Sequence, residues 1–201
     1  YLVVGLTLAA CAPTRPIAPE TARQQLQQIW RSDQHTIWEI DWPNVPTSGP
    51  VTIEVWQAGS RFRYEILETP APFLLGETLV SDGTQTWRYN RLVSSPSSES
   101  TGPNLAPITE AMMLISNLLS RQPIEATTQA DSVNLFPATK ILMLYPSGDS
   151  LAMWIDDQAA GLPRRVEFSV GEQRGQLTAR FSEPLTNPPS ALFTVDDWIN
   201  N

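Results

Sequence analysis

Histidine and cysteine are nearly absent from this sequence of 201 residues, which has one of each, His35 and Cys11. A single cysteine cannot form an intrachain disulfide, and without His or Cys pairs at ligand spacing the chain offers no zinc site. A Ser-His-acid site would depend on His35 alone, for which we expect a surface position between a helix and a strand. Gly-x-Gly-x-x-Gly and P-loop patterns do not occur. The sequence therefore predicts a protein that is not an enzyme and binds no metal or cofactor.

Positive charge is also scarce. Thirteen Lys and Arg stand against 21 Asp and Glu, which gives a formal net charge of −8 and a sequence pI of about 4.6. This balance disfavours binding to nucleic acid and attraction to anionic lipid head groups. The counts of 18 Pro and 7 Trp favour a sheet-rich domain with broken loops over a helical bundle. If the protein attaches to a membrane, surface charge does not hold it there.

The apolar run at residues 2–10 is too short to cross a bilayer as a helix, which needs about 20 residues. It is typical of the end of a secretory signal, so we expect residues 1–10 to be a partial signal peptide. Cys11 follows Leu-Ala-Ala, which looks like a lipobox, where the cysteine receives a diacylglycerol thioether. A lone cysteine buried in a core strand is the alternative, but it does not explain the Pro-rich segment that follows. Residues 11–19 are then a lipidated tether of about 25 Å if extended, and residues 20–201 form a single domain.

The middle of the chain has the period-two pattern of strands with one covered face. Phe62, Tyr64 and Ile66 alternate with charged neighbours and therefore point the same way. Turn sequences with Gly and Asp separate this strand from the ones before and after it. The pattern predicts an antiparallel meander built from residues 51–57, 61–67 and 79–90.

This part of the chain resembles a known family. A strand, a short turn, an Arg-Phe-Arg-Tyr strand, Leu-Val-Ser-Asp-Gly-Thr at 79–84 and Thr-Trp-Arg-Tyr-Asn at 86–90 follow one another. That order is similar to the bacterial outer-membrane lipoprotein carrier and receptor superfamily typified by LolA and LolB, whose fold LppX-like and RseB-like proteins share. The resemblance runs from about residue 30 to 198 and is most specific over 59–90.

The resemblance implies an α+β fold in which a strongly curved antiparallel sheet, an incomplete β-barrel, carries a helical lid and holds acyl chains beneath it. It also implies an arginine on an early strand that latches the lid. The predicted first strand, 36–42, has no arginine. Arg61, Arg63 and Arg88 lie on later strands, and the latch is assigned to none of them.

Two segments have helical spacing of apolar residues. Residues 20–30 predict an amphipathic helix that rests a narrow stripe on the sheet, and residues 107–119 predict a helix with a broader apolar side. Two interpretations of the second helix stay open. It is either ordinary core that plugs the curved sheet, or a movable cover in which Met112 and Met113 adapt to acyl chains. The Ser-rich loop at 94–104 would permit such motion.

The carboxy-terminal half predicts four successive strands, at 138–146, 151–155, 163–170 and 176–181, which favours a meander over a parallel sheet. Residues 122–137 show no clear pattern. The carboxylate pairs at 156–157 and 196–197 lie beside a predicted turn or the terminus and are expected to be solvated. The segment 187–193 resembles the family's closing segment, where a Leu-Phe pair docks on the barrel.

Strand parity and the second helix select seven candidate residues that line an apolar ligand cavity. They are Trp56, Phe62, Tyr64, Trp87, Tyr89, Met112 and Ile115.

From these features we expect a membrane-anchored lipoprotein that binds acyl chains of lipids or lipidated proteins between sheet and lid, as a carrier or receptor without catalysis. The acylated Cys11 would place it in the cell envelope, on the outer face of the cytoplasmic membrane or on the outer membrane. The alternative is an envelope sensor or interaction module that uses the same fold to bind a partner protein.

Overall fold

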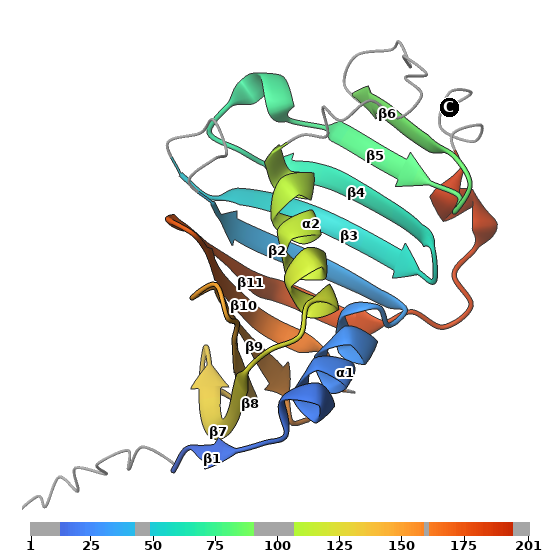
Figure 1. The fold of residues 1–201 in the computed structure, drawn as a ribbon. Helices are drawn as coiled ribbons and strands as arrows, with labels where there is room; N and C mark the ends of the chain where they lie inside the picture. The colour runs from blue at the N-terminus through green and yellow to red at the C-terminus, as the bar shows by residue number, and fades with distance from the viewer. Residues whose placement is uncertain (1–12, 43–48, 91–106, 159–160, 195–201) are drawn as a thin grey trace, which may run out of the picture.

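The structure, a computed structural model, describes residues 13–42, 49–90, 107–158 and 161–194. Within these residues the strands form one eleven-stranded antiparallel sheet in the order β1-β7-β8-β9-β10-β11-β2-β3-β4-β5-β6 (Figure 1). The strands are β1 (Arg15–Pro16), β2 (Gln34–Asp41), β3 (Val51–Ala58), β4 (Arg61–Glu68), β5 (Glu77–Ser81), β6 (Thr86–Asn90), β7 (Glu125–Val133), β8 (Phe136–Leu144), β9 (Ser150–Asp156), β10 (Pro163–Val170) and β11 (Gln173–Pro184).

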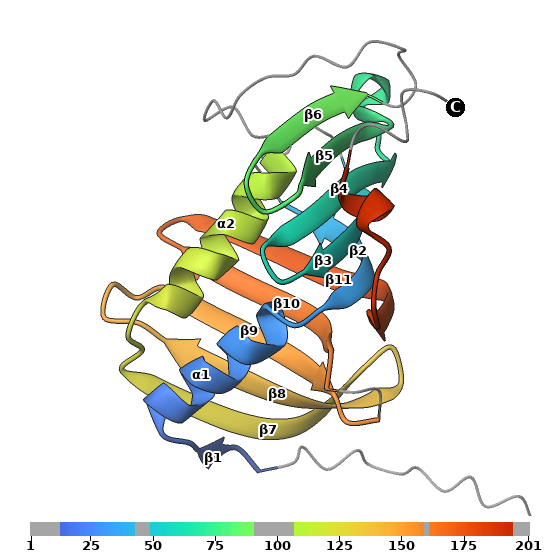
Figure 2. The same cartoon turned by 90° about the vertical axis from the view of Figure 1, so that its right-hand side faces the viewer.

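Two helices, α1 (Pro19–Trp30) and α2 (Pro107–Ser120), lie against the concave face of this sheet (Figures 1 and 2). Short 3-10 turns occur at η1 (Pro72–Leu74) and η2 (Ser190–Phe193). The sheet curves strongly and its two edges, β1 and β6, do not pair with each other. The predicted α+β class, an incomplete antiparallel barrel with a helical cover, is confirmed.

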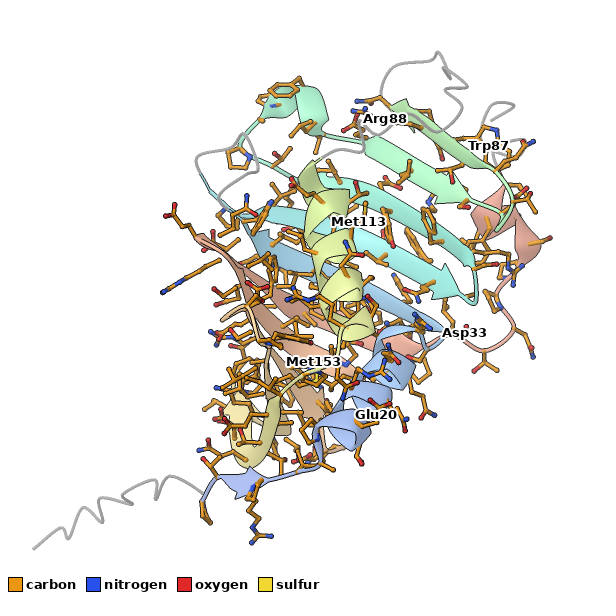
Figure 3. All side chains as sticks on the ribbon, in the orientation of Figure 1. Glu20, Asp33, Trp87, Arg88, Met113 and Met153 are labelled. Atoms are coloured by element: carbon orange, nitrogen blue, oxygen red, sulfur yellow. The ribbon has the colours of Figure 1, made fainter. Side chains whose placement is uncertain are left out.

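Both helices have the expected faces. Proline at the start of α1 costs no hydrogen bond there, and Ala22, Leu26 and Trp30 form its buried stripe. In α2, Ile115 is fully buried, whereas Met113 is 49% exposed on the opposite side. Figure 3 labels Met113 on α2 and, on β9, Met153, which is buried in the core. Both helices therefore bury apolar faces against the sheet, but Met113, expected to adapt to acyl chains together with Met112, points away from the sheet.

The β7–β8 hairpin is the element that the sequence pattern does not reveal. Its turn consists of Asn134 and Leu135, with φ angles of 51° and 71°. Positive φ at both central residues is what a tight hairpin turn of type I′ requires, and Asn-Gly is its usual sequence. Because leucine occupies the second position, the turn carries no glycine signal and residues 122–137 show no boundary.

The strand β1 lies within the segment predicted to be a tether. Arg15 pairs with Thr128 of β7 and Pro16 with Thr127, and the amide of Ile17 donates to the carbonyl of Ala126 at 3.0 Å. The Pro-rich segment thus contributes an edge strand before α1 begins. Residues 1–12, including Cys11, lie outside the described residues.

Candidate functional site

The register of the strands decides which side chains face the helices. Trp38 of β2 lies opposite Ile53 of β3, which lies opposite Ile66 of β4. These three residues belong to the same buried cluster as Ile115 of α2 and Leu26 of α1. They therefore mark the concave face of the sheet. Along each strand, every second residue from them shares that face.

Hydrogen bonds hold α2 to α1 at the carboxy-terminal half of α2. The indole Nε1 of Trp30 donates to Ser116 Oγ at 3.1 Å, and Gln27 Nε2 donates to the carbonyl of Leu119 at 2.6 Å. The end of α1 is fixed in turn, because Gln57 Nε2 on the concave face of β3 donates to the carbonyl of Trp30 at 3.2 Å. This end of α2 is consequently attached to the sheet through α1.

A second attachment follows directly after α2. Arg121 Nη1 donates to Asp149 Oδ2 at 2.6 Å, and its guanidinium lies 5.1 Å from the centre of the Tyr145 ring. Asp149 also accepts hydrogen bonds from the hydroxyl of Ser147 and the amide of Gly171. These donors, with Arg121, lower the pKa of Asp149 to about 2. We call this group, Arg121 with Asp149, Tyr145, Ser147 and Gly171, the clasp. It ties the end of α2 to the β8–β9 turn.

The concave face is less completely covered at the β4–β5 end of the sheet. Phe62 and Tyr64 stack with ring centres 4.8 Å apart and an angle of 16° between them. Both are half-buried, as is Leu79, which lies opposite Tyr64 on β5. Tyr64 also packs against the cluster that contains Met112 of α2. We call Phe62, Tyr64 and Leu79 the apolar strip. It is a part of the concave face where neighbouring apolar side chains keep exposed surface, and Tyr64 joins it to the buried cluster.

The apolar strip favours uncharged contacts. The Tyr64 hydroxyl is neutral at physiological pH, as tyrosine ordinarily is, and burial raises its pKa further, to about 12. Polar groups mark the edge of the sheet beyond the strip: Arg88 of β6 lies opposite Leu79 and forms an ion pair with Glu77. A long apolar molecule with a polar end matches this arrangement, in which apolar side chains are followed across the sheet by an ion pair.

The sequence left three arginines, Arg61, Arg63 and Arg88, as possible lid latches. Of these, Arg88 lies on the concave face. Arg61 and Arg63 point to the outer face, as the parity of β4 requires. On β6, Arg88 and its neighbour Trp87 consequently point to opposite sides of the sheet; Figure 3 labels both.

The structure brings together four of the seven predicted lining residues. Phe62 and Tyr64 lie on the concave face, and Met112 and Ile115 lie on the buried side of α2. Whether they bind a ligand stays a prediction.

Trp56, Trp87 and Tyr89 do not join them. Trp56 pairs with Arg63, and Trp87 pairs with Val80, all on the outer face. The prediction that these three aromatic residues lie on the same face as Phe62 and Tyr64 is therefore wrong. Leu79, which the prediction missed, has the right parity in the Leu-Val-Ser run but no aromatic ring to attract notice.

The outer face is covered as well, which explains the misplacement. Trp56 lies between His35, whose ring stacks on it at 4.9 Å and 4°, and Arg63, whose guanidinium is 5.3 Å from the ring centre. Arg63 is only 1% exposed and donates to Glu65 Oε2 at 2.8 Å. The turn η2 packs against β4, with the buried Phe193 ring 4.8 Å from the Arg61 guanidinium. The Leu-Phe segment thus docks on the barrel, as the resemblance implies.

The acids and the histidine form no reactive constellation in the described part of the chain. His35 is half-buried, with Nε2 2.7 Å from Glu54 and Nδ1 3.2 Å from Glu183. Asp156 is buried and paired with Arg164, so the expectation that it is solvated is wrong. Among the described residues no group of His, Cys, Asp and Glu could hold a metal ion. The pair at 196–197 lies outside the described residues.

An open polar groove of about 550 Å³ runs along the ends of β10 and β11, and Arg174, Glu167 and Asp41 contribute its charges. None of the helices that the structure describes has the length and hydropathy needed to span a membrane.

No protein-family model matches the chain, and no curated protein matches its sequence. Among solved structures, an uncharacterised conserved protein from Thermus thermophilus aligns with a TM-score of 0.53 at 14% identity, over 86% of this chain and 92% of its own. The lipoprotein LppX from Mycobacterium tuberculosis aligns with a TM-score of 0.50 at 14% identity, over 85% of this chain and 99% of its own. A LolA superfamily protein from Nitrosomonas europaea aligns with a TM-score of 0.41 at 13% identity, over 90% and 99%.

The chain has a LolA/LppX-like fold, as its sequence resemblance predicts. At this level of identity the likeness describes the arrangement of elements. What the fold binds here has to be argued from this chain's own side chains.

Proposed function

We propose that this protein is an envelope lipoprotein that binds acyl chains between the concave face of its sheet and α2, as a carrier or receptor without catalysis. The observation that carries the proposal is the apolar strip: Phe62, Tyr64 and Leu79 lie on the concave face and are only half-buried, and Tyr64 packs against the cluster that contains Met112 of α2. The remaining apolar surface suits a flexible hydrocarbon chain.

The energetics support a ligand of this kind. Apolar surface removed from water contributes about 25 cal/mol per Å², or about 0.8 kcal/mol for each methylene group buried. An acyl chain therefore gains affinity with length and needs no charged partner along most of it. Met112 of α2, in the same cluster as Tyr64, is an unbranched side chain that adapts to such a ligand.

Membrane attachment is the second part of the proposal. Residues 1–10 are the end of a signal peptide, Cys11 carries the lipid, and the domain follows. Acyl chains on Cys11 would hold the protein on the outer face of the cytoplasmic membrane or on the outer membrane, since two chains anchor a protein stably. Mass spectrometry of the amino-terminal peptide tests this part directly.

We further propose that α2 is a movable cover. Its hydrogen bonds to α1 and the clasp both lie at its carboxy-terminal half. These attachments fix the carboxy-terminal end of α2, so opening would move the amino-terminal half, with the buried Thr109, Ala111 and Met112, away from the sheet. Hydrogen exchange checks this: amides of α2 should exchange faster than those of β2 and β3 without ligand and become protected with it. Equal protection of helix and strands under both conditions would rule the cover out.

A matched pair of variants tests the ligand site. Leu79→Gln places an amide in the apolar strip, whereas Leu142→Gln makes the same change at a half-buried leucine on the outer face. We expect Leu79→Gln to weaken binding of a fluorescent fatty acid about tenfold, or 1.4 kcal/mol, and Leu142→Gln to leave it unchanged. Thermal melting of both variants reports any loss of folding.

Two outcomes would point elsewhere. Equal effects of the two variants would place the ligand outside the apolar strip. Absence of fatty-acid binding, together with capture of a partner protein that Leu79→Gln does not affect, would favour the alternative role as an envelope sensor or interaction module.

A further inference from the structure

The tip of the β7–β8 hairpin carries two exposed apolar side chains. Leu135 is 96% exposed and has a φ of 71°, a conformation that costs a non-glycine residue about 1–2 kcal/mol. Phe136, the next residue, is 48% exposed. Folding would be served better by glycine at position 135 and by a polar residue at position 136. Stability therefore does not account for Leu135, and the Phe136 ring, although it contacts Arg164, leaves about half of its surface exposed.

The amino-terminal segment leaves the sheet toward this tip. Going backward along the chain, Pro16, Arg15 and Thr14 lie beside Thr127, Thr128 and Gln129 of β7 in turn. Each step backward moves toward the turn at Asn134. Figure 2 shows the start of β1 on the same side of the molecule as the β7–β8 hairpin.

The remaining distance is short. Gln129 and Leu135 are six positions apart, which is about 20 Å along a strand. Cys11 is three positions before Thr14, a length of chain that spans at most about 10 Å. A lipid on Cys11 is therefore within reach of the membrane surface that the tip would touch.

We propose that Leu135 and Phe136 contact the lipid bilayer in which the acyl chains on Cys11 are inserted. This rests on the proposed function in one respect, the acylation of Cys11. The contact would orient the domain, with the β7–β8 tip toward the membrane and the far end of the hairpin, at Ile124, away from it. Two short apolar side chains enter only the interface and do not span the bilayer.

The charges near the tip indicate which bilayer it suits. The guanidinium of Arg164 lies 4.5 Å from the centre of the Phe136 ring, but it is paired with the carboxylate of Asp156. Asp131, also near the tip, accepts a hydrogen bond from Trp154 Nε1 and remains exposed. Lys140 and Arg165 also act on Asp131, but Arg165 pairs with Glu167, and Asp157 adds a carboxylate beside Pro137. The tip thus has no excess of positive charge, and its contact with a zwitterionic bilayer should not depend on salt.

The two ends of the hairpin supply a matched test. Ile124 is 63% exposed at the opposite end, where its amide donates to the carbonyl of Leu144. The acylated chain has no free thiol, because Cys11 is its only cysteine. Leu135→Cys and Ile124→Cys therefore each introduce one site for an environment-sensitive fluorophore. The labelled full chains are reconstituted in phosphatidylcholine liposomes that contain a nitroxide-labelled lipid.

We expect at least threefold stronger quenching at position 135 than at 124, unchanged in 0.5 M NaCl. Equal quenching at both positions, or stronger quenching at 124, would overturn the proposal; so would a position-135 signal that appears only with an added protein. As a control on function, Leu135→Ser should leave fatty-acid binding unchanged.

Failure of acylation is distinguishable from failure of the contact. If mass spectrometry finds Cys11 unmodified, the anchoring part of the proposed function fails. The Cys11→Ser chain, attached through an amino-terminal hexahistidine to nickel-chelating lipid, then decides the contact with the same two labels. Stronger quenching at position 135 supports the contact there, and equal quenching refutes it.

Discussion

Replacing Asp149 by asparagine should weaken the protein at neutral pH and remove part of its sensitivity to acid. The carboxylate is buried in the clasp, where Arg121, Ser147 and the amide of Gly171 lower its pKa from the ordinary 3.8 to about 2. The difference between these two pKa values corresponds to about 2 kcal/mol of stability. Because the folded pKa is the lower one, this stabilisation is present above about pH 4 and is lost as the pH falls toward 2.

Urea unfolding at a series of pH values measures the effect. We expect Asp149→Asn to lower the free energy of unfolding at pH 7 by about 2 kcal/mol, and the wild-type and variant curves to converge between about pH 4 and pH 2. Glu125→Gln removes an exposed carboxylate at the start of β7 and serves as the charge-matched control, with a change below about 0.5 kcal/mol. An Asp149→Asn curve that stays parallel to wild type down to pH 2 would refute the assignment.

Two further substitutions test the strain at the β7–β8 turn and the close packing at Gly175. Leu135→Gly should raise stability by about 0.5–1 kcal/mol, because it relieves the positive φ at a fully exposed position, and a higher melting temperature would show it. Gly175→Ala should lower stability by about 2–3 kcal/mol, because a Cβ there would lie 2.4 Å from the Phe168 ring and 2.6 Å from that of Trp42. An unchanged unfolding midpoint for Gly175→Ala would mean that the two rings move aside easily.

The order of elements could be predicted from local patterns. Alternation of apolar and charged residues in 61–67 corresponds to β4, and the predicted helices over 20–30 and 107–119 correspond closely to α1 and α2. Each of these signals depends on neighbours within a few positions of the sequence. Such signals survive folding because the packing of the sheet agrees with them.

The inner face of β4 was predicted correctly, but the inner faces of β3 and β6 were not. Arg63 and Glu65 are charged yet buried, because η2 packs against the outer face of β4. Alternation identifies two faces, but it does not identify the concave one when both are covered. The aromatic rings of Trp87 and Tyr89 suggested the interior, whereas the half-buried Leu79 on the concave face carries no such signal.

The β7–β8 hairpin was missed for another reason. A two-residue turn with positive φ is usually recognised by its glycine, and here leucine occupies the second position. The same residue is the most exposed large apolar side chain among those described. Leucine where glycine is expected in the turn thus coincides with the place where we propose that the protein contacts the lipid bilayer.

Native mass spectrometry of the full chain with Cys11→Ser, purified from the envelope and sprayed under gentle conditions, tests acyl-chain binding most directly. The account predicts adducts with the mass of a long-chain lipid, which an excess of fatty acid displaces and which Leu79→Gln reduces while Leu142→Gln does not. A spectrum with the bare protein alone, from a folded sample that also fails to bind a fluorescent fatty acid, would contradict it.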